Sequence, residues 1–205
     1  MHDVRPTSSP PLGRRDLLVR LGGVALSFTG LTAFTRLTRF TARVAAPKWD
    51  DRFEVAVDLE IAPQQGGRYH RPYVAVWVED TAGRPVRTLS VWVNTSGRGP
   101  RYIRELRRWS TAERDQQNAG GPDLVATVSS ATRLPGQYTV TWDGRDDRGK
   151  PVEQGAYRFV IEAAREHGTY QLMQQELTLA TKPVAADLPG NEEIARARVE
   201  YRRRK

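Results

Sequence analysis

Three aspartates are crowded into the stretch WDGRDDRGK, residues 142–150. Carboxylates this close together can ligate calcium, serve as a general acid and base, or shape a tight turn. A calcium loop needs acids at alternating positions and a closing bidentate acid. Asp143, Asp146 and Asp147, with Glu153 further along, fit that pattern poorly, and the sequence indicates no pocket that would support paired-carboxylate catalysis.

The composition of the same stretch favours a compound turn between two strands. Aspartate side chains hydrogen-bond to nearby backbone groups, and glycine permits the positive φ angles that such turns need. Trp142 ends the first strand, and its ring is expected to pack across the sandwich. The residues assigned to this structural turn are Trp142, Asp143, Gly144, Asp146, Gly149 and Gly155.

Alternation of apolar and polar residues predicts the strands that must hold this turn. Strands are expected at residues 53–61, 73–80, 86–93, 138–142, 156–164, 170–179 and 193–201. The second and third of these are expected to pair as a hairpin, as are the fifth and sixth. The fourth and fifth, which flank WDGRDDRGK, are also expected to form a hairpin.

One segment has helical rather than strand spacing. PRYIRELRRWSTAERDQQ, residues 100–117, places Tyr102, Ile103, Leu106 and Trp109 on one helical face. Its proline is typical of a helix start, and the glycines of NAGGPD are expected to end it. An all-β chain with one inserted helix predicts an Ig-like β-sandwich, which forms a single domain over residues 47–205.

The charge of the chain is unevenly placed. The formal net charge is +8, but residues 1–46 hold seven arginines and only two acids. The remaining residues carry 25 basic and 22 acidic side chains, so no nucleic-acid partner is expected. The chain has no cysteine, which excludes disulfides, thiolate metal sites and cysteine nucleophiles.

Residues 1–46 have the parts of an export signal. GRRDLLV, with Arg14 and Arg15, resembles the twin-arginine export motif, which implies passage through the twin-arginine translocase. The weakly hydrophobic stretch from Leu21 to Phe34 is shorter than the ~20 residues that span a bilayer. The prediction is therefore a twin-arginine-type signal peptide and a periplasmic protein, anchored at the outer face of the inner membrane if the signal is not cleaved. The alternative is a cytoplasmic protein whose basic amphipathic helix lies on a membrane surface.

Two further groups of side chains can do chemistry but are more typical of solvated surfaces. His70 and His167 fall in expected loops without clustered carboxylates beside them, so neither is expected to be a metal ligand or a base. The arginines of the expected helix could contact anionic lipid headgroups or an acidic partner, although a solvated face is the commoner meaning of such a run. They are Arg101, Arg104, Arg107, Arg108 and Arg114.

Longer stretches resemble known families. YTVTWDGRDDRGKPVEQGAYRFVIEA, residues 138–163, is similar to the Ig-like hairpin of flagellar hook-capping proteins, in which the hairpin is architectural. RPYVAVWVEDTAGRPVRTLSVWV, YIRELRRW and ATRLPGQYTVTWDGRDDRGKPV, in that order, resemble a family of predicted periplasmic proteins (domain of unknown function 2271). This second resemblance implies an exported Ig-like domain, often encoded near membrane proteins with peptidase-propeptide-like domains and a periplasmic flavin transferase.

The association with a flavin transferase draws attention to VSSAT, residues 128–132. Such transferases attach flavin mononucleotide (FMN) through its phosphate to the last Ser or Thr of a motif that begins with Asp. Its final four positions match Ser129, Ser130, Ala131 and Thr132, so Thr132 is the candidate FMN attachment site. The leading Asp would be residue 126, which is alanine. The alternative is an ordinary Ser/Thr-rich loop before the next strand.

These observations predict a periplasmic, non-catalytic Ig-like module that binds or supports a membrane-associated protein, in a redox or metal-uptake assembly. Exposed sheet edges or the arginine-rich helix would supply the contact surface. The alternative is an electron-transfer protein that carries FMN at Thr132 after modification by a periplasmic flavin transferase. A third reading is a hydrolase that uses Asp143, Asp146 or Asp147.

Overall fold

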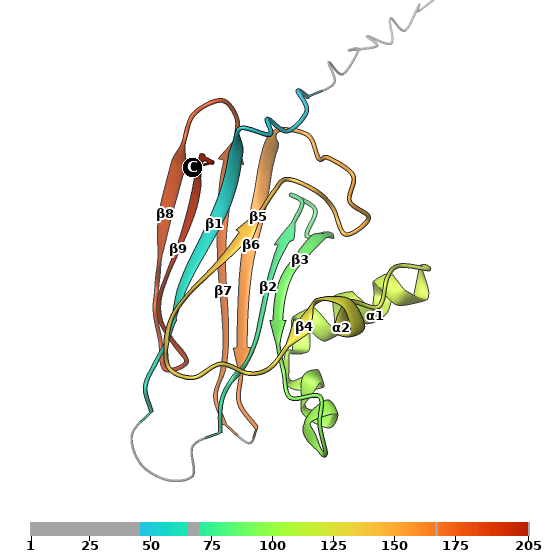
Figure 1. Cartoon of the computed structure of the whole chain (residues 1–205), viewed down its shortest axis with the longest axis vertical. Coiled ribbons are helices and arrows are strands. Elements are labelled where there is room, and N and C mark those ends of the chain that lie inside the picture. The colour runs from blue at the N-terminus through green and yellow to red at the C-terminus, as the bar shows by residue number, and fades with distance from the viewer. Residues whose placement is uncertain (1–45, 65–69, 167, 205) are drawn as a thin grey trace, which may run out of the picture. The chain divides into compact units, whose positions relative to one another are not determined.

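Alternating residues produce two facing β-sheets in the computed structural model, which describes residues 46–64, 70–166 and 168–204 (Figure 1). One sheet has the strand order β5-β1-β9-β8 and the other β4-β3-β2-β6-β7. The strands are β1 (Phe53–Ile61), β2 (Tyr73–Glu79), β3 (Pro85–Trp92), β4 (Ser129–Ser130), β5 (Gly136–Trp142), β6 (Gly155–Ala164), β7 (Tyr170–Leu179), β8 (Val184–Pro189) and β9 (Ile194–Arg203). The predicted all-β sandwich is confirmed.

The main core lies between the two sheets. The apolar face of β1 is buried there, as its alternation predicts, because successive strand side chains point to opposite sides of a sheet. Its inward residues are Phe53, Val55, Val57, Leu59 and Ile61, each at most 2% exposed. Phe53 stacks on Tyr201 of β9, with ring centroids 4.7 Å apart.

A helical layer covers the outer side of the five-stranded sheet and creates a second core. It consists of the 3-10 helix η1 (Gly99–Glu105) and the helices α1 (Arg107–Asn118) and α2 (Leu124–Val128), with α1 and α2 beside β2 and β3 in Figure 1. Leu106 and Trp109 pack on Ala75 and Trp77. Strand β2 is therefore buried on both faces, which explains its continuous apolar sequence.

The expected helix differs from the observed one. Leu106, with φ −73° and ψ 72°, is not helical and separates η1 from α1. The helix predicted for residues 100–117 is therefore two helices of different type. The structure adds α2, which Asp123 caps by accepting a hydrogen bond from the N–H of Ala126, and the strands β4 and β8, none of which the periodicity predicted.

Two of the three expected hairpins are confirmed and one is wrong. Strands β2 and β3 pair antiparallel, as do β6 and β7. The strands on either side of WDGRDDRGK, β5 and β6, belong to different sheets, where β5 pairs with β1 and β6 with β2 and β7. Strand β6 is buried on both faces from Phe159 to Ala164, because the main core lies on one side of it and the helical layer on the other.

The predicted signal peptide, including Arg14 and Arg15, lies outside the described residues except for Ala46. No helix in the described part of the chain is long and apolar enough to cross a membrane.

Candidate functional site

The acidic stretch forms a compact connection between the two sheets. Asp146 Oδ1 accepts hydrogen bonds from the N–H groups of Arg148 at 2.9 Å and Lys150 at 2.8 Å. Asp143 Oδ1 accepts from the N–H of Arg145 at 3.1 Å. Gly149 adopts a φ of +78°, which favours glycine. These carboxylates therefore bond to the backbone of their own connection, which leads into β6 at Gly155.

Gly144 allows this connection to lie flat against the aromatic core. Its φ is +77°, and a Cβ atom at this position would lie 1.9 Å from Cδ2 of Trp49. Trp142 packs against Trp49 with ring centroids 5.0 Å apart and donates its Nε1–H to Arg145 O at 2.8 Å. Trp49 is held in turn by a hydrogen bond from its N–H to Val152 O.

Asp147 differs from the other two aspartates because it is buried. Its side chain is only 5% exposed and lies against the free edge of β3. Its N–H donates to Val86 O at 3.0 Å, and its Oδ1 accepts from the N–H of Thr88 at 2.9 Å. Burial raises the pKa of this carboxyl, an effect that the Thr88 N–H and the nearby Arg87 partly oppose.

Two acceptors beside this carboxyl lack a hydrogen-bond partner. They are Asp147 Oδ2 and Gln116 Oε1, both of which are buried from solvent. The Gln116 amide lies close enough to the Asp147 carboxyl to lower its pKa, yet makes no hydrogen bond to Oδ2 within normal distance.

A surface pocket of about 420 Å³ lies beside this cluster. Its lining includes Asp146, Asp147, Gln116, Asp80 and Tyr157, but not Asp143. Burial raises the pKa of Tyr157 to about 12, and its hydroxyl donates to Glu153 O. In the described residues, no group of three or more His, Asp or Glu side chains is arranged to hold a metal ion. Of the three candidates for hydrolysis, Asp146 and Asp147 thus line this pocket, whereas Asp143 does not.

The Ser/Thr motif lies at the edge of the five-stranded sheet. Ser129 and Ser130 form β4, which pairs in parallel with Val91 and Trp92 of β3. Thr132 follows and is partly exposed. A pocket of about 440 Å³ is lined by polar side chains around this motif: Arg71, Asn94, Thr95, Ser96, Ser129, Ser130 and Thr132, together with Val93 and Ala131. Asp123, the nearest preceding acid, is occupied as the N-cap of α2 at 2.9 Å from Ala126 N.

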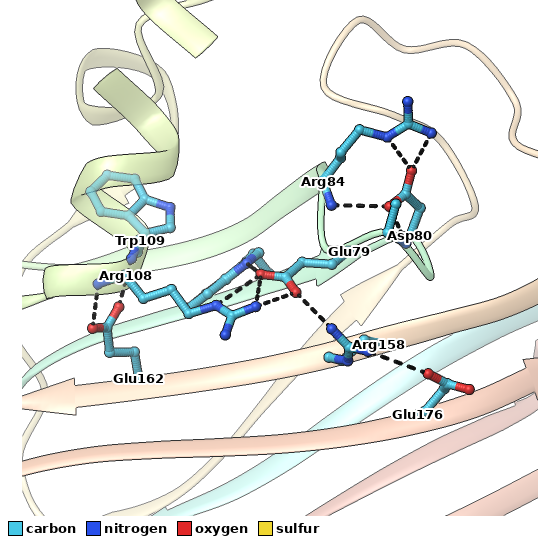
Figure 2. Close-up of polar contacts among 10 residues, drawn as sticks. Glu79, Asp80, Arg84, Arg108, Trp109, Arg158, Glu162 and Glu176 are labelled. Atoms are coloured by element: carbon cyan, nitrogen blue, oxygen red, sulfur yellow. Dashed lines mark hydrogen bonds and ion pairs between the residues drawn. The ribbon is translucent and has the colours of Figure 1, made fainter. Parts of the chain in front are cut away.

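A buried charge cluster fixes α1 to the sheet (Figure 2). Arg108 donates two hydrogen bonds to Glu79 from Nη2, at 2.7 and 2.9 Å, and one from Nε. Glu79 is 1% exposed and also accepts the Nε1–H of Trp77 at 2.9 Å, while Arg158 approaches it to 3.6 Å. The arginine that the sequence placed on the outer face of the helix, Arg108, thus points inward.

Glu162 of β6 caps α1 from across the second core. Its Oε1 accepts from the N–H of Arg108 at 2.9 Å and its Oε2 from the N–H of Trp109 at 2.8 Å (Figure 2). These are N–H groups of the first helical turn, which have no partners inside the helix. Sequence reasoning missed Glu79 and Glu162. Their signal is an acid within the apolar runs VAVWVE and FVIEAA, which indicates a buried charge.

The remaining arginines of the helical layer point outward. We call Arg98, Arg101, Arg104, Arg107 and Arg114 the basic helical layer, and each is exposed. Arg107 lies over the ring of Tyr170 at 4.8 Å. Among the described residues, no carboxylate lies within ion-pair distance of any of the five. Glu166 lies instead near the histidine of the neighbouring loop, 3.7 Å from Nδ1 of His70.

The fold and these sites define an all-β sandwich with a basic helical layer on one face. A family model described as predicted periplasmic protein, DUF2271, matches residues 54–196. The match covers more than two thirds of the 205 residues, and the chain belongs to this family of periplasmic proteins. No curated protein and no solved structure is significantly similar to the chain.

Proposed function

We propose that the chain is a non-catalytic periplasmic module that binds a membrane-associated partner through the basic helical layer. This proposal rests on a difference between the helical layer and the outer side of the four-stranded sheet: carboxylates of the described residues neutralise the arginines on one of these faces and not on the other. Exposed arginines on the helical layer have no acidic partners among the described residues. On the outer side of the four-stranded sheet, the arginines Arg196, Arg198 and Arg202 are matched by carboxylates.

The neutralised face shows the contrast. On the outer side of the four-stranded sheet, Arg196 pairs with Glu60 at 2.7 Å. Arg198 pairs with Asp187 at 3.0 Å, and Arg202 with Glu54 at 3.0 Å. Unpaired arginines attract anionic groups over a distance of about one Debye length and bind carboxylates in a bidentate manner. The helical layer is therefore the face suited to an acidic partner.

The acidic connection supports the non-catalytic part of the proposal. Asp143 and Asp146 accept backbone hydrogen bonds within the connection, and Asp147 holds the edge of β3. Carboxylates with such structural partners are poorly placed for proton transfer to a substrate.

Cross-linking inside cells tests the proposed contact face. A photoreactive amino acid replaces Arg104 or Arg114 on the layer, or the exposed Thr141 on the four-stranded sheet as the matched control. We expect one membrane protein to be cross-linked from both layer positions and not from the control. Cross-links from Thr141 alone, or from none of the three positions, would contradict the proposal.

A second function is favoured by the polar pocket around Thr132. In this alternative, FMN is joined to Thr132 Oγ1 by a phosphoester bond. The hydroxyl oxygen attacks the FMN phosphorus of a flavin dinucleotide, the nucleoside monophosphate leaves, and the hydroxyl proton passes to the catalysing flavin transferase. The Arg71 guanidinium in the pocket lining would bind the phosphate. Bound FMN would supply electron transfer, which fits a redox assembly at the membrane.

Intact mass spectrometry after coexpression with a flavin transferase tests this alternative. An FMN adduct is expected on the wild-type chain and on Ser129→Ala, and none on Thr132→Ala. If the wild type carries no adduct, or Thr132→Ala keeps it, this second function is wrong.

A further inference from the structure

Three arginines of the basic helical layer form a row along η1. Arg98, Arg101 and Arg104 are three residues apart, and Arg98 is the N-cap, with φ −88° and ψ −6°. In a 3-10 helix, side chains at i and i+3 eclipse one another, and three residues advance the helix by about 6 Å. The three exposed side chains therefore emerge in one line, about 6 Å apart.

The opposite side of η1 fixes this row to the sandwich. Leu106 is fully buried in the second core, and Ile103 packs against the same core. Tyr73 of β2 donates its hydroxyl hydrogen to Gly99 O at 3.1 Å. Gly99 approaches Asn94 so closely that a Cβ atom at residue 99 would lie 2.2 Å from Asn94 O. The backbone that carries the arginines is thus held at both its start and its end.

The charges in the row lack local compensation. No ion pair joins Arg98, Arg101 or Arg104 to a carboxylate in the described residues, and like charges at this separation repel one another. An anionic partner that presents charges at the same interval would relieve this repulsion at all three positions. Acidic residues at i, i+4 and i+8 of an α-helix recur about every 6 Å along its axis.

We propose that the row of Arg98, Arg101 and Arg104 docks an acidic α-helical segment of the membrane-associated partner, with carboxylates at i, i+4 and i+8. This inference rests on the proposed function and gives its partner a chemistry. A lipid surface fits less well, because a membrane-binding helix inserts an apolar face. The apolar residues of η1 pack inward, and the large apolar side chains most exposed in the described residues, Leu134 and Tyr170, are not on it.

Synthetic helical peptides provide the test. Two alanine-rich peptides of about 20 residues have the same composition with three glutamates, placed at i, i+4, i+8 in one and at i, i+5, i+10 in the other. The first arrangement forms a row, whereas the second distributes the acids around the helix. Vesicles containing phosphatidylglycerol are the third probe. Binding to the full chain is measured at about 50 mM salt by fluorescence anisotropy or co-sedimentation.

We expect the wild-type chain to bind the row peptide about fivefold more tightly than the scattered peptide. Replacing Arg98, Arg101 and Arg104 by glutamine should abolish that preference. Replacing Arg148, Lys150 and Lys182, which are exposed elsewhere, should keep it. Equal binding of both peptides by the wild type would overturn the inference while leaving the proposed function intact. Vesicle binding that depends on the row, without peptide binding, would overturn it in favour of a lipid partner.

Discussion

The carboxylate of Asp147 accepts a hydrogen bond from the backbone N–H of Thr88 at 2.9 Å and thereby occupies the open edge of β3. Strand β4 pairs with β3 only at Val91 and Trp92, so the rest of that edge would otherwise be unpaired. Exposed strand edges promote association with other chains. A residue that is a candidate for catalysis in the sequence thus has a structural role in the fold.

Replacing Asp147 by asparagine should stabilise the protein at neutral pH. Burial raises the pKa of Asp147, so the folded state holds this proton more tightly than the unfolded chain, and stability falls as pH rises through the folded-state pKa. Asparagine can still accept the hydrogen bond from Thr88 and brings no charge into this buried position. We expect a gain of about 1 kcal/mol at pH 7 that vanishes below about pH 4, measured by urea unfolding.

The control for this prediction is Asp187→Asn, which removes an exposed acid and should show no such pH-dependent gain. A loss of stability in Asp147→Asn at pH 7 would mean that Gln116 already donates its amide to an ionised carboxylate.

Replacing Glu162 by glutamine should loosen α1. Glutamine can accept only one of the two hydrogen bonds from Arg108 and Trp109, because its NH₂ group faces the other N–H. A loss of about 1–3 kcal/mol is expected, with faster hydrogen exchange at those two amides. Glu176→Gln, whose side chain is 53% exposed, should change stability by less than about 0.5 kcal/mol. Unchanged exchange in Glu162→Gln would argue against the cap.

Two glycines of the acidic connection provide a matched pair. Alanine at Gly149 incurs only the backbone strain of a positive φ, about 1 kcal/mol, because open space surrounds the added Cβ. Alanine at Gly144 has the same strain and also clashes with Trp49, so its total cost should be about 3 kcal/mol. Thermal or chemical unfolding measures both. Equal costs would mean that Gly144 does not lie against the Trp49 ring.

The Glu79–Arg108 pair should be strongly coupled. Arg108→Met leaves the buried Glu79 carboxylate with only Trp77 and the more distant Arg158 as partners. We expect a loss of about 2 kcal/mol in the free energy of unfolding. This loss is smaller than that for a fully buried pair because Arg108 is 34% exposed. In a double-mutant cycle with Glu79→Gln, the two losses should not add, since the second change removes the charge that the first leaves unpaired. Additive losses would show that the two side chains act independently.

Local patterns predicted most of the strands. Burial of one face produces alternation of apolar and polar residues, as in β1, and burial of both faces produces a continuous apolar run, as in β2. These patterns predicted the β2–β3 and β6–β7 hairpins but not the separation of β5 and β6 into different sheets. The alternation of β5 fits either sheet, whereas the two-sided burial of β6 fits the sheet that also lies under the helical layer. Strand β8 was missed because its inward residues include only one large buried side chain, Leu188, and it ends in a proline.

The candidate sites were harder to predict because their contacts are distant in sequence. Glu162 lies 54 residues from Arg108, and Asp147 lies 59 residues from Thr88. Arg101 and Arg104 were assigned to an α-helix over residues 100–117, which did not include Arg98. The non-helical Leu106 confines the row of Arg98, Arg101 and Arg104 to the 3-10 helix η1.

The most direct test of the docking function is sedimentation of the purified chain with membranes from the cells that produce it. The first variant reverses charge on the basic helical layer by replacing Arg101, Arg104 and Arg114 with glutamate. The second variant makes the same charge change elsewhere, at Arg148, Lys150 and Lys182. The bound fraction should fall about tenfold in the first variant and by less than about twofold in the second. Equal losses in both variants, or no loss in the first, would contradict docking through the helical layer.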